Sequence, residues 1–524
     1  MYLLIPGRHH IITQFQFEYL EKLCTESKHK DVNGTAIKIT QPPEAIIFAI
    51  TSANHSNTRR NPLPFYLRAI AIEAMSKDLP VPVYIFGIND VGTISNFANY
   101  TIKCIQHESE GLFSCNPGNT IVICSTPVLE LYERLGFSIL PAELSDRKLW
   151  SYKTAMPWNI VEKIAFENNA EKNDSLKKLI HQSSLFVWNK YHLDKKVQML
   201  FRDEMIGNDG DLTETRDYNI YVRQMDEIAE LKFSDTSRYI QAGRIGDIGC
   251  AVGSWIRLAC KENRLRESDF YGIEISRHLY EICRQRKENN EFENQFVFFS
   301  QKNAVTGLVF EKNSMNTIHT SSLTHEIESY GSRKDLLQFI QNRYEELAPG
   351  GVWINRDVVA PFEKEKEVLM WLKKDDGSND DPFSQFDNSI QLSAHLQSLS
   401  TYGRFLRFAK DFRSEEGYQL PFIALEKENR IYIQLSLKNA AEFLSRKDYY
   451  DNWKSEMHET FCFWDFEEWK QELKKVGFRI DPSSTAYTNK WIADNRWVGK
   501  ATLHGLNLEI LDYPVTTMLL IGIK

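Results

Sequence analysis

A stretch of small residues, followed by a strand that ends in an acid, limits the fold more than any other feature of the chain. The stretch from Arg244 to Trp255 begins as a short strand and breaks into Asp247-Ile248-Gly249-Cys250-Ala251-Val252-Gly253 before a helix-like run from Ser254. Small residues are needed where a strand turns sharply into a helix beside a bound nucleotide. A second apolar strand ends in Glu274, 27 residues after Asp247. A Rossmann-type unit binds a ribose diol with an acid at about this spacing.

The pair of stretches resembles motif I and the following acidic position of class I S-adenosylmethionine-dependent methyltransferases. The resemblance implies that the glycine turn holds the methionine part of S-adenosyl-L-methionine, and that the acid binds its ribose hydroxyls. An NAD-type dehydrogenase is the competing interpretation, but D-x-G-C-A-x-G is not G-x-G-x-x-G. The third interpretation is a Rossmann-like unit that binds no ligand. The implied cofactor-binding residues are Asp247, Gly249, Cys250, Ala251, Gly253 and Glu274, with Asn303 and Ala304 beside the adenine.

Candidate catalytic residues follow the fourth and fifth predicted strands, at 315–320 and 352–359. Ligands of open parallel sheets bind beyond the carboxyl ends of the strands, so His325, Glu326 and Arg356 should lie near the transferred methyl group. A histidine with a pKa near neutral suits the removal of a substrate proton. The alternative is that His325-Glu326 caps the following helix. The turn Leu347-Ala-Pro-Gly-Gly351 is another feature similar to class I methyltransferases.

An insertion, residues 361–477, precedes the last predicted strands, and we expect it to be mainly helical. Methyltransferases of this class build substrate-selective lids at such a position. Arg404, Arg407, Lys410 and Arg413 recur every three residues, which predicts a basic stripe on a helix. Such a stripe would receive an anionic group of the acceptor. The alternative is a solvated helix face.

The first 165 residues alternate predicted strands with helices, which is typical of a parallel sheet covered on both faces. The Gly7-Arg8 pair, the loop at 52–62 and the strand ending at Asp90 are similar in order to archaeal-type nicotinamide mononucleotide adenylyltransferases. The resemblance implies a site for ATP or another nucleotide with Mg²⁺. The nucleotide-binding residues that it implies are Gly7, Arg8, Ser52, Asn61 and Lys153.

This part of the chain departs from that family at its catalytic positions. The family carries H-x-G-H after its first strand, where this chain has Thr13-Gln14-Phe15-Gln16, and a later arginine is missing near Lys153. Electrostatic stabilisation of developing phosphate charge is the main catalytic device in such transfers. Adenylyl transfer should therefore be weak or altered. The alternative is a fold kept for binding a nucleotide or a partner.

The length of 524 residues predicts more than one domain. We expect an α/β protein with two Rossmann-like, doubly wound domains joined by a helical segment: a nucleotidyltransferase-like domain at 1–165, a helical linker at 166–235 and a methyltransferase domain at 236–524. Eight cysteines without a CxxC pair predict reduced thiols in the cytoplasm and no metal site. No stretch of 18 apolar residues exists, which predicts no membrane association.

These features favour a methyltransferase that acts on a small acceptor, anionic or nucleotide-linked. The net charge of −8 argues against a broad nucleic-acid surface, and the basic stripe favours a phosphate-bearing acceptor. Two alternatives remain open. One is an RNA methyltransferase with an RNA-positioning N-terminal domain, and the other is a noncatalytic scaffold that senses nucleotides.

Overall fold

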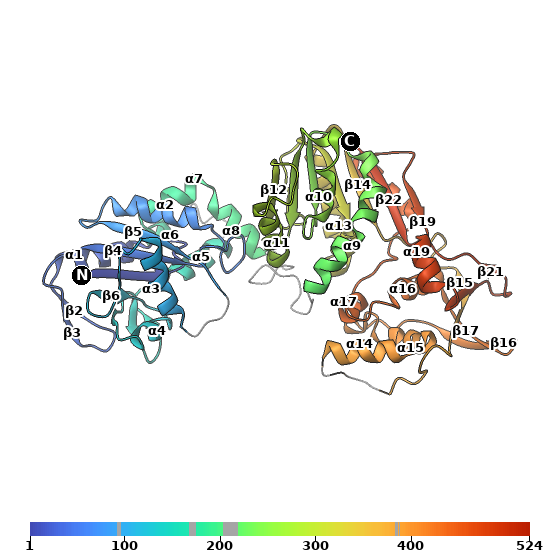
Figure 1. Ribbon diagram of the computed structural model, residues 1–524, viewed down its shortest axis with the longest axis horizontal. Helices are drawn as coiled ribbons and strands as arrows, with labels where there is room; N and C mark the ends of the chain where they lie inside the picture. The colour runs from blue at the N-terminus through green and yellow to red at the C-terminus, as the bar shows by residue number, and fades with distance from the viewer. Residues whose placement is uncertain (92–95, 167–173, 203–217, 383–385, 387) are drawn as a thin grey trace. The chain divides into compact units, whose positions relative to one another are not determined.

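The chain forms two units, Met1–Gly210 and Asp211–Lys524, which are described separately. Figure 1 shows the computed structural model, which describes residues 1–91, 96–166, 174–202, 218–382, 386 and 388–524. The predicted linker at 166–235 is divided between the units. Its helices α6 (Asp174–Lys177), α7 (Gln182–Lys190) and α8 (Leu193–Arg202) belong to unit 1, and α9 (Tyr218–Thr236) belongs to unit 2. Residues 167–173 and 203–217 of that segment lie outside the described residues.

Unit 1 contains a parallel sheet with the strand order β5-β4-β1-β6-β7. Alternate residues of its central strand enter different cores: Leu3 and Ile5 pack in one cluster and Leu4 in the other. A strand buried on both faces lacks a polar side, which explains the continuous apolar run Tyr2–Ile5. The strands are β1 (Tyr2–Gly7), β4 (Ala45–Thr51), β5 (Val83–Ile88), β6 (Thr120–Ile123) and β7 (Ser138–Leu140).

The helices of unit 1 alternate with these strands along the chain or follow them. They are α1 (Gln14–Thr25), α2 (Phe65–Ser76), α3 (Phe97–Glu108), α4 (Leu129–Glu133) and α5 (Pro157–Phe166). The helices α5 to α8 add a third core against α2, in which Trp188 and Val197 pack near Leu67. Two small ladders lie outside the main sheet: β2 (Lys28–Lys30) with β3 (Ala36–Lys38), and β8 (Leu144–Asp146) with β9 (Ser151–Tyr152).

Unit 2 is built on a sheet with the order β12-β11-β10-β13-β14-β22-β18, in which β22 runs antiparallel to β14. The chain order reverses between β10 and β13, so the topological switch point lies at their carboxyl ends, where ligands of such sheets bind. The strands are β10 (Arg244–Ile248), β11 (Asp269–Glu274), β12 (Val297–Gln301), β13 (Met315–Ser321), β14 (Leu347–Asp357), β18 (Arg479–Ile480), β19 (Thr485–Tyr487) and β22 (Thr517–Ile523).

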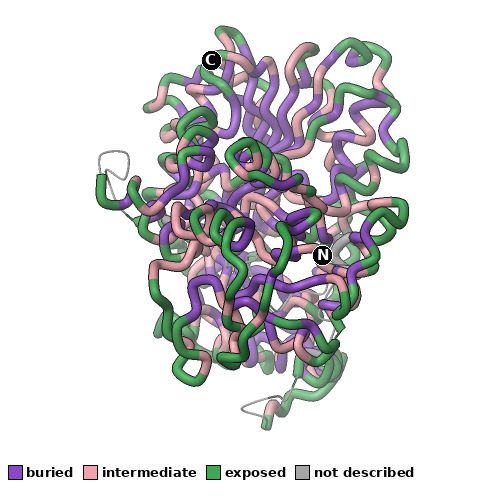
Figure 2. The backbone as a smooth tube through the Cα atoms, turned by 90° about the vertical axis from the view of Figure 1, so that its left-hand side faces the viewer, coloured by how far each residue is buried: buried purple, intermediate pink, exposed green. Residues whose placement is uncertain are grey.

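Two apolar clusters cover the faces of this sheet. One contains Ile248, Met315 and Trp353, and the other contains Ile245, Phe270 and Ile354. Figure 2 shows the strands near the C-terminus as a largely buried block. The helices of this core are α9, α10 (Ser254–Ala259), α11 (Arg277–Glu288), α12 (Thr324–Tyr330), α13 (Arg333–Glu346) and α18 (Phe466–Val476). Both units thus combine helices with mainly parallel sheets, which agrees with the predicted α/β class.

In the described residues of the insertion, 361–477, helix outweighs strand, but the insertion also contributes to a sheet that the prediction did not include. This sheet is antiparallel, with the order β16-β17-β15-β20-β21. The last two strands come from beyond residue 477, so the interval 361–477 does not hold the whole sheet. The strands are β15 (Glu367–Leu372), β16 (Ile423–Lys427), β17 (Arg430–Ser436), β20 (Ala501–His504) and β21 (Ile510–Leu511).

Helices of the insertion, and one helix from beyond residue 477, pack on this sheet around buried aromatic rings. Phe405 lies 5.2 Å from Phe443 and Phe408 lies 5.5 Å from it, measured between ring centroids. The helices are α14 (Ser389–Ser398), α15 (Thr401–Asp411), α16 (Leu437–Arg446), α17 (Trp453–His458) and α19 (Lys490–Ile492). Helix α18 belongs instead to the core, because Trp469 and Leu473 pack in the cluster of Trp353.

Candidate active site

The loop after β10 has the backbone that its small residues predict. Gly249, Ala251 and Gly253 have positive φ angles of 71°, 49° and 74°. The amides of Gly249 and Cys250 donate to the carbonyl oxygen of Ile273, at 2.9 and 3.1 Å, which folds the loop onto the end of β11. A left-handed backbone at three residues within one turn favours glycine and other small residues. The loop therefore brings its backbone close to the carboxyl edge of the sheet.

Glu274 ends β11 and is buried against this loop. Its carboxylate accepts hydrogen bonds from the amides of Ala251, Ile275 and Ser276, at 2.8, 2.9 and 2.9 Å. Burial raises its pKa to about 7, although the three amides act in the opposite direction. An ionised carboxylate offers about four acceptor sites, so capacity remains for a further donor.

Two buried hydroxyl groups lie at the same edge of the sheet. The side-chain oxygens of Ser276, after β11, and Ser321, at the end of β13, have no hydrogen-bond partner among the described residues. Buried polar atoms in native proteins normally have a partner, either in the protein or in a ligand or water. The carboxyl edge between β11 and β13 thus offers polar groups to a ligand.

Other predicted cofactor residues have partners within the chain. Asp247 Oδ1 lies 2.7 Å from Nδ1 of His319 on the neighbouring strand, and His319 stacks on Trp255 with ring centroids 4.0 Å apart. Asn303 Oδ1 accepts the amide of Val305 at 2.9 Å and so closes the turn after β12, where Ala304 is buried. Because Asp247 lies on β10 and His319 on β13, their contact joins these two strands.

The contacts of His325 do not favour its predicted role as a base. Its Nδ1 lies 2.6 Å from Asp357 Oδ1, and its Nε2 lies 3.4 Å from Glu459 Oε2. Burial opposes a charge here, but the two carboxylates outweigh it and hold the pKa of His325 well above its usual value. A protonated imidazole with both nitrogens engaged cannot accept a substrate proton. His325 is instead a buried cation.

The alternative for this segment, a helix cap from His325-Glu326, is not observed either. Asp357 at the end of β14 caps α12, because its Oδ2 accepts the amides of Leu323, Thr324 and His325, at 3.1, 2.6 and 3.2 Å. An acceptor for the first amides of a helix stabilises it. Asp357 therefore orders the start of the helix that follows β13.

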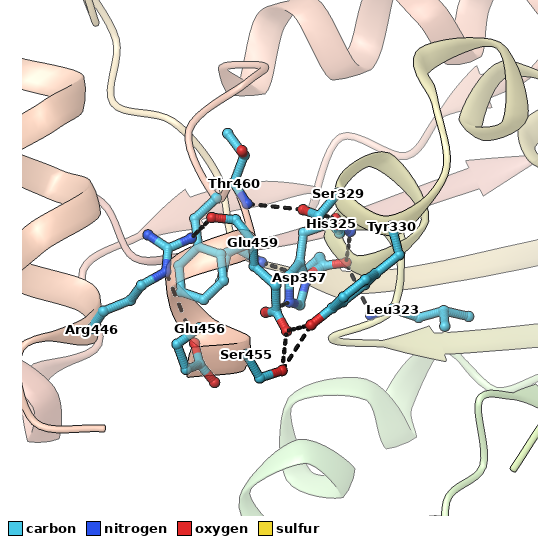
Figure 3. Close-up of polar contacts among 12 residues, drawn as sticks. Leu323, His325, Ser329, Tyr330, Asp357, Arg446, Ser455, Glu456, Glu459 and Thr460 are labelled. Carbon is cyan, nitrogen blue, oxygen red and sulfur yellow. Dashed lines mark hydrogen bonds and ion pairs between the residues drawn. The ribbon is translucent and has the colours of Figure 1, made fainter. Parts of the chain in front are cut away.

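Glu459 connects this cation to the insertion. Figure 3 shows it beside His325 and Tyr330, and its Oε1 lies 3.1 Å from the Tyr330 hydroxyl. The same hydroxyl is 2.7 Å from Ser455 Oγ on α17. The Thr460 amide also donates to Ser329 Oγ at 2.8 Å. The segment after α17 is thus fixed to α12 of the core by several polar contacts.

Arg356 does not meet an acceptor, and its predicted catalytic role is not supported. Its Nε donates to Asp235 Oδ2 of α9 at 2.8 Å, and the Tyr487 hydroxyl donates to the same oxygen at 2.8 Å. The Arg356 side chain is 9% exposed. Because its guanidinium is engaged by a carboxylate of the chain, Arg356 holds the end of α9 against β14.

The basic residues of α15 do not form a surface stripe. Arg404 contacts Asp448 at 3.3 Å and also the hydroxyl of Tyr450, and both Arg404 and Arg407 are buried. Arg407 bonds to Asp411 at 2.6 Å. A spacing of three residues along a helix turns slowly, so it does not distinguish a solvated side from one that buries ion pairs. These contacts do not favour the expectation that these arginines hold an anionic acceptor.

Two charged residues complete the edge, and one of them was missed from the sequence. Glu326, in the first turn of α12, is partly exposed and lies near Glu274. Lys232 of α9 is also partly exposed, and its charged neighbours are Asp247, Glu326, Asp357 and Arg356. Lys232 was missed because a single lysine in a charge-rich helix belongs to no sequence pattern that indicates a functional site.

Of the predicted nucleotide residues in unit 1, Gly7 and Arg8 lie at the carboxyl end of β1 and Ser52 lies at the carboxyl end of β4. Arg68 of α2, which sequence reasoning missed, donates to the carbonyl oxygens of Arg8, Thr51 and Ser52, at 3.1, 2.9 and 2.9 Å. Asn61 is buried, whereas Lys153 is exposed and lies 3.4 Å from the Ala142 carbonyl oxygen. The buried arginine thus ties the ends of both strands together.

The positions of the absent histidine signature have a structural role. The Thr13 hydroxyl accepts the amide of Gln16 at 3.0 Å, and the Gln16 side chain accepts the amide of Thr13 at 3.2 Å. This reciprocal pair is a capping box at the start of α1. Nearby, both ring nitrogens of His10 are buried without a hydrogen-bond partner among the described residues, close to Arg8 and Arg68.

No three His, Cys, Asp or Glu side chains in the described ranges are grouped as a metal site would require. The helices of the same ranges include none long and apolar enough to cross a membrane.

Part of unit 2 matches a known protein family. Residues 246–354 match the family described as "Methyltransferase domain". This interval runs from β10 to β14 and contains the glycine loop, Glu274 and His325. No curated protein matches the chain. Residues 246–354 of unit 2 are therefore similar to a methyltransferase domain.

Part of the chain is also similar to solved structures. An S-adenosylmethionine-dependent methyltransferase from Mesorhizobium loti is 12% identical, with 57% of this chain and 100% of that chain covered and a TM-score of 0.32. The YcgJ protein from Bacillus subtilis is 12% identical, with 57% and 98% covered and a TM-score of 0.29. Phosphoethanolamine N-methyltransferase 2 from Haemonchus contortus is 11% identical, with 60% of each chain covered and a TM-score of 0.31. Likenesses of this size say nothing about the substrate.

Proposed function

We propose that unit 2 transfers a methyl group from S-adenosyl-L-methionine to a small acceptor. The observation that carries the proposal is the buried carboxylate of Glu274, held against the left-handed loop Gly249–Gly253 at the switch point of the sheet. Ligands of open α/β sheets bind at this edge. The cofactor would supply the methyl group, and the chain would supply its position.

The residues at the edge fit this cofactor. The loop Gly249–Gly253 would lie against its methionine part, and Glu274 would accept hydrogen bonds from the ribose hydroxyls. The hydroxyls of Ser276 and Ser321 would gain partners. Asn303 and Ala304, in the turn after β12, would lie on the adenine side. Each of these groups is small or polar, and each lies at the carboxyl edge of the sheet, where the cofactor would bind.

The acceptor that we propose is a small molecule with a hydroxyl or amine to be methylated. Arg356, Arg404 and Arg407 already bind carboxylates of the chain, so the arginines predicted to hold an anionic or nucleotide-linked acceptor are engaged within the chain. The partly exposed carboxylate of Glu326 would favour an acceptor that donates a hydrogen bond. An RNA acceptor would need a basic surface, which a net charge of −8 does not favour.

Calorimetric titration with S-adenosylmethionine and S-adenosylhomocysteine tests the cofactor assignment without knowledge of the acceptor. Wild-type protein should bind both ligands, and the Glu274→Ala variant should bind them much more weakly. A screen for S-adenosylhomocysteine formation with amines and alcohols would then identify the acceptor class. Absence of binding by the wild type would support the noncatalytic scaffold alternative.

For unit 1 we propose nucleotide binding, with adenylyl transfer weak or altered. The specific observation is His10, whose buried nitrogens have no partner among the described residues, beside Arg8 and Arg68 at the carboxyl ends of two parallel strands. Cationic groups at this edge suit a phosphate. Titration with ATP in the presence of Mg²⁺, for wild type and for Arg8→Ala, tests this proposal. Robust dinucleotide synthesis from ATP and nicotinamide mononucleotide would contradict the weak-transfer part.

A further inference from the structure

Helix α9 is held at its middle and at its end beside the proposed methyltransferase edge. In its middle, Asp226 bonds to Arg286 at 2.7 Å and to Arg257 at 3.2 Å. At its end, Asp235 receives the hydrogen bonds of Arg356 and Tyr487. The first pair of arginines lies on α10 and α11, and the second set lies on β14 and β19. The helix is therefore fixed to both sides of the switch point.

Lys232 lies one helical turn before Asp235, between these attachment points. Its charged neighbours come from three other elements: Asp247 from β10, Glu326 from α12, and Arg356 and Asp357 from β14. β10 and β14 end, and α12 begins, at the edge where the cofactor's methyl group and the acceptor would meet. Residues three apart share a side of a helix, and Asp235 contacts Arg356 at the end of β14, so Lys232 lies on the side of α9 that faces this edge.

The acids around Lys232 have other partners. Asp247 is paired with His319, and Asp357 is paired with His325 and caps α12. Nowhere in the described part of the chain does the Lys232 amine meet a hydrogen-bond acceptor. Burial and the nearby Arg356 lower its pKa to about 8, against the pull of the three carboxylates. A substantial fraction of this amine is therefore neutral slightly above neutral pH, unlike that of an ordinary surface lysine.

We propose that Lys232 is the catalytic base of unit 2, whose neutral amine takes the proton that the acceptor loses on methylation. This inference rests on the proposed methyltransferase function. The acceptor's lone pair would form the new bond to the methyl carbon, and the electron pair of the broken carbon–sulfur bond would stay on sulfur. The acceptor's proton would move to Lys232 Nζ, which becomes an ammonium group. His325 cannot perform this step because both of its nitrogens face carboxylates.

The position of Lys232 has an electrostatic consequence that needs no acceptor to test. S-adenosylmethionine carries a sulfonium charge, whereas the sulfur of S-adenosylhomocysteine is neutral. A protonated Lys232 beside the sulfur would repel the first ligand but not the second. The preference for S-adenosylmethionine should therefore rise with pH as Lys232 loses its proton.

Calorimetry of the full chain with both ligands, between pH 6.5 and pH 9.5 on the order of one titration per half unit, tests the inference. We expect the ratio of the two affinities to rise about tenfold with pH in the wild type, relative to Lys232→Met. Ionisable groups of the ligands themselves titrate in both proteins, so the comparison isolates Lys232. Lys232→Arg keeps its charge and should hold the ratio low throughout.

If wild type and Lys232→Met each bind both ligands, and the ratio of the two affinities changes with pH in the same way in both proteins, the role of Lys232 is overturned. The proposed function would remain intact. A failure of the wild type to bind either ligand would overturn the proposed function, and the inference with it. Thermal unfolding of each variant checks that it is folded. If Lys232→Met alone fails to bind, the Lys232→Arg variant provides the test. Its ratio of S-adenosylmethionine to S-adenosylhomocysteine affinity must be low and independent of pH, and any other result overturns the role of Lys232.

Discussion

His325 Nδ1 lies 2.6 Å from Asp357 Oδ1, and this buried pair joins the helix after β13 to the end of β14. Glu459 adds a second carboxylate from the insertion on the other side of the ring. The pair therefore stabilises the edge of the sheet and connects it to the insertion. A residue that the sequence suggested as a base is a structural cation.

Replacing His325 by Gln should destabilise unit 2. The change leaves the carboxylates of Asp357 and Glu459 buried near each other without a cation, and breaking a buried pair in this way typically costs about 3–5 kcal/mol. Urea unfolding measures the loss. His278→Gln, at an exposed position of α11, is the matched control. An unchanged free energy of unfolding for His325→Gln would contradict the account of this pair.

Separating Arg356 from Asp235 should loosen α9. Arg356→Lys loses the planar guanidinium that donates to Asp235, and a hydrogen bond between charged groups contributes about 1.5–3 kcal/mol. Hydrogen exchange of α9 amides should accelerate in Arg356→Lys and in Asp235→Asn. A double-mutant cycle checks the coupling, because the combined variant should lose little more than either one. Additive effects would show that the two residues do not act together.

Replacing Arg404 by Lys should weaken the insertion but not cofactor binding. The lysine cannot reproduce contacts with both Asp448 and Tyr450, so we expect a loss of about 1–3 kcal/mol in stability. Lys410→Arg, at a largely exposed position of the same helix, is the control. Thermal unfolding and calorimetry on the same samples separate the two effects. A selective loss of acceptor binding with unchanged stability would restore the hypothesis of an anionic acceptor.

Cofactor binding should release protons below neutral pH. Burial raises the pKa of Glu274 to about 7, so the unliganded protein carries a proton there at lower pH. Hydrogen bonds from the ribose hydroxyls favour the charged form, and binding would expel that proton. The affinity should therefore fall as the pH drops below about 7. Calorimetry at pH 6 in buffers of different ionisation enthalpy measures the release, and a binding heat independent of the buffer would contradict it.

The methyltransferase core could be predicted from local patterns. The Gly249–Gly253 turn needs small residues for its left-handed backbone, and an acid at the end of the next strand is a short-range relation. Both depend on residues close in the chain. The fifth strand differs in detail, because β14 begins at Leu347 and includes the predicted Pro-Gly-Gly turn, with a register shift opposite Met315 and Thr317.

The polar partners of the site could not be predicted in the same way. Glu459 lies 134 residues after His325, and Asp235 lies 121 residues before Arg356. Whether a polar side chain meets a substrate or a distant carboxylate depends on packing between elements that no local periodicity describes. The antiparallel sheet of the insertion was missed for the same reason, since β20 pairs with β15 across an interval of more than a hundred residues.

The most direct test of the central claim is the affinity of Glu274→Ala for S-adenosylmethionine. The account predicts a loss of about 1.5–3 kcal/mol for each charge-assisted hydrogen bond to the ribose, or at least a roughly tenfold weaker binding. Glu288→Ala, an exposed acid on α11, should bind like the wild type. Calorimetry on folded protein decides the matter. Wild-type affinity in Glu274→Ala would contradict the assignment of this edge as the cofactor site.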